Sequence, residues 1–243
     1  LYTDQTAAEA TASLAQFDYQ NGWFAYSSTA SNYYSWMFKR APGFFDVVAY
    51  TGDGVGEYVD HNLGVAPEMI WVKNRDSVYE WGVYHKDIHE NKTKNLELQS
   101  SSAVKTEYEY WFGYQVPTET GFPVGTRTDS SSTNYIAYLF ASVPGVSKVG
   151  SYTGTGSAQT IDCGFSTGAR FVLIKRSDST GDWHTFDTGR GIVAGNDPRL
   201  ELNTTDAEDT SADYIDPVSS GFAVTSSSEV NASGGEYIFL AIA

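Results

Sequence analysis

The chain has 243 residues with a hydrophobic fraction of 41% and an aromatic fraction of 15%, a composition that excludes a disordered tail and leaves room for more than one domain. Its formal net charge is −15 and its isoelectric point is near 4.5, so it repels phosphate backbones and anionic lipids. We therefore expect neither nucleic-acid nor membrane partners. Its 17 Tyr, 13 Phe and 6 Trp residues favour strands, because aromatic side chains fit a pleated, half-buried surface.

Residues 1–43 form the first predicted unit, the C-terminal half of a repeat that recurs further along the chain. Tyr33 precedes an identical residue, Tyr135, by 102 positions (135 − 33 = 102), and Pro42 has an identical counterpart at the same spacing. Residues 1–9 align with residues 200–208. Half a sandwich leaves one hydrophobic face uncovered, so we expect upstream chain or a neighbouring subunit to supply the rest. A short helix is expected within residues 6–15.

Residues 44–145 form the first complete predicted repeat. Segment 50–85 matches segment 152–187 without a gap, and apolar character persists where the residue itself changes. Apolar and alternating runs separated by Gly, Asp and Asn predict about eight strands, at the spacing typical of a β-sandwich. The expected strands cover residues 45–51, 57–62, 69–73, 81–85, 96–99, 108–115, 121–125 and 135–142.

Residues 146–243 form the second complete predicted repeat. Turn-forming residues at 178–182 separate the strand-like runs 171–175 and 183–186 and predict a hairpin. We therefore predict an all-β fold of tandem antiparallel β-sandwich repeats, of the jelly-roll or Greek-key kind. A short Pro-Gly break joins each unit to the next, so consecutive sandwiches should stand in a fixed relation and form a stiff rod.

The strongest difference between the two repeats is an aromatic run. Tyr108, Tyr110, Trp111 and Tyr114 fall in the first repeat, whereas the corresponding residues 211–216 are far less aromatic. Exposed Tyr and Trp side chains stack on sugar rings and also serve protein interfaces. These four residues are the candidate ligand-binding set, with packing in the core or against another subunit as the alternative interpretation.

Two carboxylate pairs recur beside a tryptophan. Asp76 with Glu80 precedes Trp81, and Asp178 with Asp182 lies at the same place in the second repeat. A glycosidase needs two carboxyl groups facing one bond, but these pairs flank a predicted hairpin turn, where Asp is favoured for turn formation. We interpret them as structural, and a polysaccharide depolymerase would need one of them to be catalytic.

No cofactor and no metal ion are expected from the sequence. Of the four histidines, only His85 and His89 lie four residues apart, a spacing that suits a helix, whereas this segment is predicted to be a loop. Nucleophile-elbow, phosphate-loop and dinucleotide-binding motifs do not occur. The single cysteine, Cys163, cannot form a disulfide within one chain.

The repeated motifs resemble those of a known class of proteins. APGFFDVVAYTGDG (41–54) and LGVAPEMIWVKNRD (63–76), with their second copies YTGTG (152–156) and FVLIKRSDSTGDW (171–183), are similar to the tandem modules of phage tail-fibre-like proteins, notably from phages of marine bacteria. The resemblance covers nearly the whole chain. It implies a virion appendage or host-recognition fibre, and it brings no defined set of catalytic or binding residues.

The sequence thus predicts a non-enzymatic segment of a phage tail fibre or related virion appendage, acting as a rigid repeat spacer and in host attachment. The resemblance implies other copies of the same fibre chain as partners, in a homo-oligomer such as a trimer, together with other virion proteins and a host surface glycan. The expected location is the virion, as an extracellular appendage. The alternative function is a carbohydrate-binding module of a phage or cell-surface adhesin.

Overall fold

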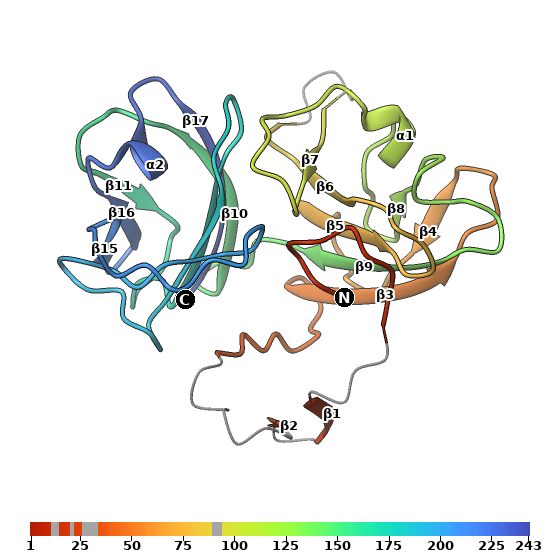
Figure 1. The fold of residues 1–243 in the computed structure, drawn as a ribbon, viewed down its shortest axis with the longest axis horizontal. Coiled ribbons are helices and arrows are strands. Elements are labelled where there is room, and N and C mark those ends of the chain that lie inside the picture. The colour runs from red at the N-terminus through yellow and green to blue at the C-terminus, as the bar shows by residue number, and fades with distance from the viewer. Residues whose placement is uncertain (11–14, 20–21, 26–33, 89–93) are drawn as a thin grey trace.

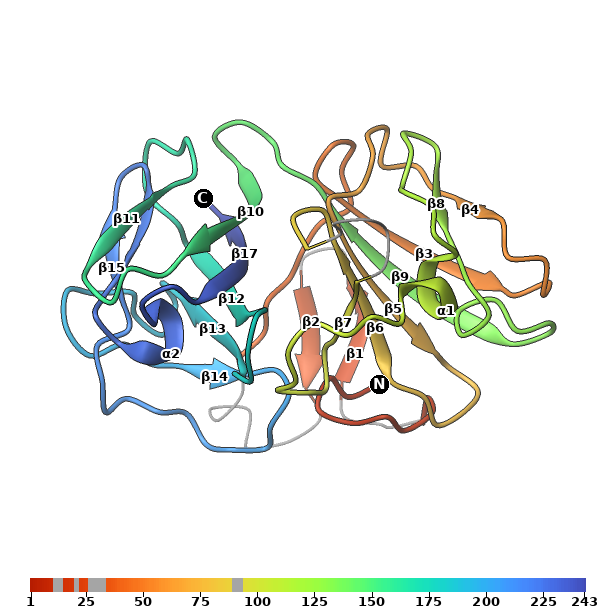
Figure 2. The same ribbon diagram turned by 90° about the horizontal axis from the view of Figure 1, so that it is seen from above.

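The computed structural model describes residues 1–10, 15–19, 22–25, 34–88 and 94–243. Strands form nearly all of the regular structure, and the helices within these residues, α1 (Tyr108–Phe112) and α2 (Ser228–Asn231), are short. The all-β prediction is confirmed. Two β lobes lie side by side in both views (Figures 1 and 2), one built from residues 44–145 and the other from residues 146–243.

The first lobe, called repeat A, contains two antiparallel sheets. The larger sheet has the strand order β3-β9-β5-β6-β7, and β4 pairs with β8 in the smaller one. Tyr50 faces Tyr135 across the pair β3 and β9, so the first and last strands of the repeat lie next to each other. The bounds are β3 Phe45–Thr51, β4 Tyr58–Asp60, β5 Met69–Asn74, β6 Trp81–His85, β7 Leu96–Glu97, β8 Gly121–Pro123 and β9 Asn134–Phe140.

The second lobe, called repeat B, repeats the topology of the larger sheet strand for strand. Its larger sheet has the order β10-β17-β12-β13-β14, and its smaller sheet, β11-β16-β15, has one strand more than that of repeat A. Tyr152 faces Tyr237 at the position of the Tyr50 and Tyr135 pair. The bounds are β10 Ser147–Thr153, β11 Gln159–Asp162, β12 Phe171–Arg176, β13 Trp183–Asp187, β14 Leu200–Glu201, β15 Ile215–Val218, β16 Gly221–Val224 and β17 Glu236–Ile242.

Both faces of the large sheets are covered by apolar side chains. In β12, Val172 and Ile174 belong to the interior of repeat B, whereas Phe171 and Leu173 belong to a core that repeats A and B share. Because successive residues of a strand point to opposite faces, burial of both faces requires an unbroken apolar run. This explains why β5 and β12 read as continuous hydrophobic segments.

The shared core fixes the relation between the two lobes. Met69, Trp81 and Phe140 of repeat A meet Phe171 and Leu240 of repeat B in one cluster of buried side chains. The link between the lobes is also a defined turn, since Val143 and Ser147 form a β-bridge across it and Gly145 adopts a φ of 73°. The lobes are therefore packed against each other and not only tethered.

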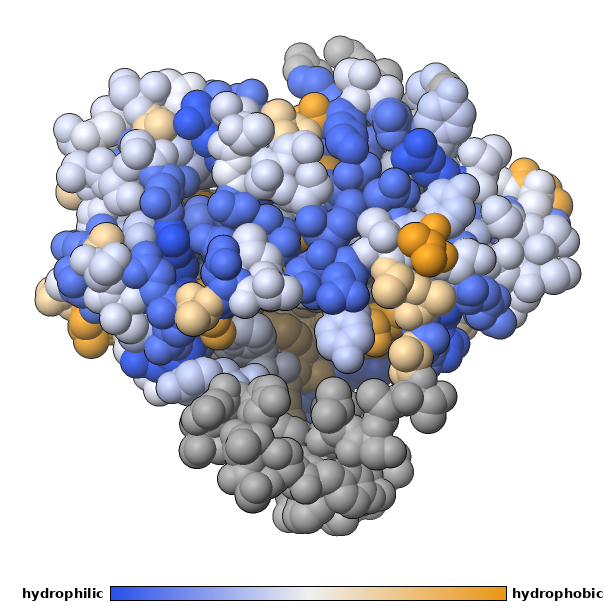
Figure 3. Space-filling view, in the orientation of Figure 1, coloured by the Kyte–Doolittle hydropathy of each residue, from blue (hydrophilic) through white to orange (hydrophobic). Residues whose placement is uncertain are grey.

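Residues 34–43 run along the seam between the lobes without strand structure. The Phe38 ring lies 5.6 Å from the ring of Phe45 in repeat A and 5.6 Å from the ring of Phe171 in repeat B. Trp36 donates a hydrogen bond from Nε1 to Asp187 Oδ2 at 2.9 Å. Figure 3 shows a largely hydrophilic face with apolar side chains in the hollow between the lobes.

The N-terminal region differs from the prediction of a short helix. Residues 6–10 are not helical, residues 11–14 lie outside the described residues, and β1 (Ala15–Tyr19) begins at Ala15 and pairs with β2 (Gly22–Ala25). The helix is absent from residues 6–10 because their backbone makes hydrogen bonds to repeat A: Tyr79 N donates to Thr6 O and Glu9 N donates to Arg75 O. The hairpin of β1 and β2 lies below the lobes in Figure 1.

The prediction of a strand at residues 108–115 was also wrong. The backbone instead forms α1, followed by Gly113 and Tyr114 with φ values of 60° and 58°, in the left-handed region that an extended strand cannot use. The helix places Trp111 and Phe112 in the core of repeat A, where both are almost completely buried. Trp111 lies directly over Gly82 of β6, where a Cβ atom would be 2.1 Å from the indole Cε3.

We predict that Gly82→Ala destabilises the protein by about 1–3 kcal/mol, because the new methyl group overlaps the buried indole ring. Chemical denaturation of the purified variant measures the change in the free energy of unfolding. In a Trp111→Leu background the overlap is removed, so the cost of Gly82→Ala should shrink markedly. Equal costs in both backgrounds would contradict this packing.

Candidate functional site

The contact between the repeats includes a segment of repeat A that lies on the β12–β13 hairpin of repeat B. This segment, residues 96–104, is called docking segment A. It accepts a hydrogen bond at Ser101 O from Gly181 N at 2.9 Å, and Val104 N donates to Ser177 O at 2.9 Å. The indole Nε1 of Trp183 donates to Glu97 O at 3.0 Å. Backbone groups of the segment are therefore paired with the end of the hairpin.

Residues 1–9, called docking segment N, make the same three bonds to repeat A. Trp81 Nε1 donates to Tyr2 O at 3.0 Å, in the way that Trp183 donates to Glu97 O. Tyr79 N donates to Thr6 O at 2.9 Å, and Glu9 N donates to Arg75 O at 2.7 Å. The alignment of residues 1–9 with residues 200–208 therefore has a structural counterpart, because segment N occupies on repeat A the place that docking segment A occupies on repeat B.

A buried lysine completes the contact in repeat B. Lys175 is paired with Trp183 across β12 and β13, and its Nζ donates to Ser101 O at 3.3 Å, Ser102 O at 3.0 Å and Arg176 O at 2.7 Å. Burial lowers the pKa of Lys175 from 10.5 to about 8. Repeat A has the same pair, Lys73 with Trp81, and burial lowers the pKa of Lys73 as well.

The carboxylates beside these tryptophans have structural partners. Asp76 Oδ2 accepts from the backbone N of Asn134 at 2.7 Å, and Asp178 Oδ1 accepts from the backbone N of Glu236 at 3.1 Å. Asp178 also forms an ion pair with Arg176 at 2.8 Å, and this hydrogen bond lowers its pKa. Both residues join the hairpin end to the last strand of their own repeat.

The aromatic residues singled out in the sequence do not form one surface. Trp111 is 1% exposed and belongs to the core, whereas Tyr110 is 46% exposed and Tyr114 is 51% exposed. Tyr108 begins α1, and its side chain lies outside the described residues. Trp111 is therefore a packing residue, and the four residues do not act together as a stacking platform.

A polar pocket of about 460 Å³ opens in repeat B at the border with docking segment A. Charged side chains from β12, β13, β14 and the start of α2 line it, and Ser101 of repeat A contributes to its edge. His184 and Glu201 face each other across β13 and β14. The charged and imidazole side chains at the pocket are Arg176, Asp182, His184, Arg199, Glu201 and Glu229.

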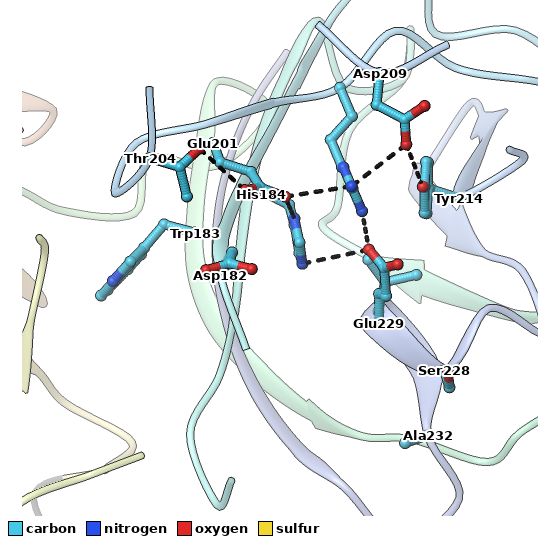
Figure 4. Close-up of polar contacts among 12 residues, drawn as sticks. Asp182, Trp183, His184, Glu201, Thr204, Asp209, Tyr214, Ser228, Glu229 and Ala232 are labelled. Atoms are coloured by element: carbon cyan, nitrogen blue, oxygen red, sulfur yellow. Dashed lines mark hydrogen bonds and ion pairs between the residues drawn. The ribbon is translucent and has the colours of Figure 1, made fainter. Parts of the chain in front are cut away.

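Arg199 is the centre of this cluster, because it pairs with three carboxylates. Figure 4 shows His184 between two of them, Glu201 and Glu229. The Arg199 Nη2 lies 3.2 Å from Glu201 Oε1 and 3.3 Å from Asp209 Oδ2, and its Nη1 pairs with Glu229. The guanidinium carbon lies 4.4 Å from the centre of the Tyr214 ring. Arg199 Nε is buried and has no hydrogen-bond partner within the described part of the chain.

The electrostatics of the cluster favour the ionised forms of Asp209 and Glu201 and the neutral form of His184. Hydrogen bonds from Ser211 and Tyr214 lower the pKa of Asp209 to about 2, and a hydrogen bond from His184 lowers the pKa of Glu201. Burial lowers the pKa of His184, against the opposing effect of Glu201. The pocket thus offers carboxylate acceptors beside guanidinium donors, a combination that can bind the hydroxyl groups of a polar ligand.

Among its described residues, the same region of repeat A contains no such cluster. Gly82 stands at the position of His184, and the Trp111 ring fills the space above it. Arg127 occupies the position of Glu229, and its guanidinium carbon lies 5.5 Å from the centre of a Trp111 ring. The pocket was not predicted from the sequence, although the differences between the repeats at these two positions indicate it.

Among the described residues, no group of three or more His, Cys, Asp or Glu side chains is placed to hold a metal ion. His85 is fully buried, and burial lowers its pKa to about 3, whereas His89 lies outside the described residues. Neither helix in the described ranges has the length and apolar character needed to cross a membrane.

Lys175 gives the contact between the repeats a measurable pH dependence. Between pH 8 and 10.5 the unfolded chain holds a proton on this lysine that the folded chain has lost, so stability rises with pH in that window. We expect the wild type to gain stability relative to Lys175→Met across this range, by up to about 1.4 kcal/mol per pH unit. Urea denaturation of both proteins at several pH values measures the difference, and a difference that does not change with pH would refute the assignment.

Comparison with known proteins places the chain in a family without assigning an activity. No curated protein and no solved structure matches it. One family model matches residues 1–243, the whole chain. The chain therefore belongs to the family described as Domain of unknown function (DUF7483).

Proposed function

We propose that this chain is a non-enzymatic structural segment of an extracellular fibre of the phage tail-fibre kind, in which it acts as a rigid repeat spacer. The observation that carries the proposal is the docking contact that occurs twice with the same backbone partners, on Trp81 and on Trp183. A fibre needs each unit to fix the orientation of the next, and a contact of this kind fixes it. Catalysis has no use for such repetition.

The shared core supports the same function. A spacer resists bending when consecutive domains bury apolar surface between them, because a change of angle would expose that surface to water. Phe171 and Leu173 of repeat B are buried against repeat A in this way. The proposed location, the virion surface, follows from the resemblance of the repeated motifs to tail-fibre modules.

Rigidity predicts a narrow distance distribution between the lobes. Nitroxide labels on Val55→Cys in repeat A and Val193→Cys in repeat B sit on side chains that are 66% and 47% exposed. Cys163 is buried, and burial raises the pKa of its thiol to about 12, so it should not react with the label. Double electron–electron resonance should give one narrow peak. A broad or multiple distribution would argue against the spacer function.

The proposed location has its own test. Antibodies raised against the purified chain should decorate an external appendage of the intact phage particle in immunogold electron microscopy. Labelling of disrupted particles alone, or of host cell envelopes without phage, would overturn the virion assignment while leaving the rigidity measurement intact.

Carbohydrate binding is the second candidate function, and the pocket of repeat B favours it. Glu229 is half exposed at the edge of the pocket and lies beside Arg199, a carboxylate and guanidinium pair that suits vicinal hydroxyl groups. A glycan array should detect binding that is lost in Glu229→Ala. The matched control is Arg127→Ala at the equivalent position of repeat A, which should keep binding. Loss in both variants, or no binding by the wild type, would exclude the pocket as a glycan site.

A further inference from the structure

The chain contains a third copy of the docking segment. Residues 200–208, called docking segment B, have the same length and the same turn as residues 96–104. Each is closed by an isolated β-bridge, between Asn95 and Lys105 in one case and between Arg199 and Asp209 in the other. Docking segment B is therefore already folded in the conformation that docks.

Docking segment B has no hairpin lying on it within the described residues, and its exposure reflects this. Leu96 and Leu98 of docking segment A are fully buried, and Ala103 is half-buried beneath repeat B. In docking segment B, residues 205–208 are all exposed, including Ala207 at the position of Ala103. The same fold thus carries a surface that is covered in repeat A and open in repeat B.

We propose that docking segment B binds the β5–β6 hairpin of repeat A in a second copy of this chain, in place of that copy's residues 1–9. The hairpin is suited to this partner because Trp81 Nε1 and Tyr79 N already bind a segment that aligns with it. Repeating this head-to-tail contact builds a filament or, if the rotation closes, a ring.

Charge favours this pairing. Glu9 of segment N forms an ion pair with Arg75 at 2.5 Å, and the aligned residue of docking segment B is also an acid, Glu208. Docking segment A has Val104 at this place, opposite Ser177. Glu208 lies 3.3 Å from Arg190 Nη1 within its own repeat, so pairing with Arg75 requires that contact to open.

Segment N leaves much of its apolar surface unburied. Leu1 is 38% exposed and Tyr2 is 49% exposed, whereas Leu96 and Glu97 at the equivalent positions are buried. Segment N therefore fits repeat A less completely than docking segment A fits repeat B. It acts as a cap on the β5–β6 hairpin, and a docking segment that fits better can replace it. The inference rests on the proposed structural function and adds its partner and its mode of assembly.

Removal of the cap tests this inference. A variant lacking residues 1–9 should form larger species than the whole chain does in analytical ultracentrifugation, and a peptide of residues 1–10 added in trans should reverse the increase. Adding Ala207→Arg should abolish this further association, whereas Val55→Arg, which changes the charge equally on an exposed residue of repeat A, should not. A folded variant that is no larger than the whole chain, or that shows the increase despite Ala207→Arg, would overturn the proposal.

A second measurement keeps the whole chain and so does not depend on the truncation folding. Glu9→Lys places a like charge against Arg75 and should release the cap, with Glu57→Lys as the control on another exposed acid. A chain that carries Glu9→Lys together with Tyr79→Cys and Thr205→Cys should form dimers when a short thiol cross-linker is added, because Thr205 aligns with Thr6, which binds Tyr79. The pair Ser101→Cys and Gly181→Cys should couple within one chain and serves as the positive control.

The outcomes separate the two proposals. If the positive control cross-links within one chain but the test pair gives no dimers, association through docking segment B is refuted. The rigidity measurement would be unaffected by that result. Flexible lobes together with cross-linked dimers would refute the spacer function and leave the association in place.

Discussion

The apolar core between the two large sheets determines how the repeats are arranged. A sandwich with one solvent-facing sheet would have alternating strands and no fixed partner. Here the outer faces are also apolar: Phe171 and Leu173 in β12 and Ile238 and Leu240 in β17 all belong to the shared core. At about 25 cal/mol per Å² of apolar surface removed from water, covering such a face stabilises the contact between the repeats. The hydrogen bonds at the border of this face then select one orientation of the two repeats.

The two repeats differ in how they fill the space beside β6 and its counterpart β13. In repeat A the space beside β6 is filled by an indole ring, which requires Gly82 beneath it. In repeat B the strand carries His184 there, and Arg199 and Glu229 surround a cavity instead. A buried cluster of charges costs desolvation energy that an apolar filling avoids. In repeat A the fold accommodates an apolar side chain at this place, so the architecture does not require the polar pocket of repeat B.

The positions of the main strands along the chain were largely predictable, whereas the site was not. Hydrophobic runs and turn residues located β3, β5, β6 and β9 to within a few residues, because burial and turn geometry are local properties of the sequence. The aromatic run at 108–115 predicts a strand, since aromatic residues favour strands, but the packing of Trp111 on Gly82 stabilises a helical turn there instead. The pocket depends on residues from four separate elements, and only the folded chain brings Arg199 to Glu229.

The buried Lys175 explains why the docking contact between repeats A and B is specific. Burial lowers the pKa of Lys175 to about 8, and the carboxylates of Asp182 and Asp178 oppose this effect. The Lys175 Nζ donates hydrogen bonds to three carbonyl oxygens. Two of these, at Ser101 and Ser102, belong to the neighbouring repeat. A shifted segment would leave the lysine and the Trp183 indole unpaired, at a cost of about 1–3 kcal/mol for each buried group. Apolar surface brings the repeats together, and the hydrogen bonds from Lys175 and Trp183 can form in only one register.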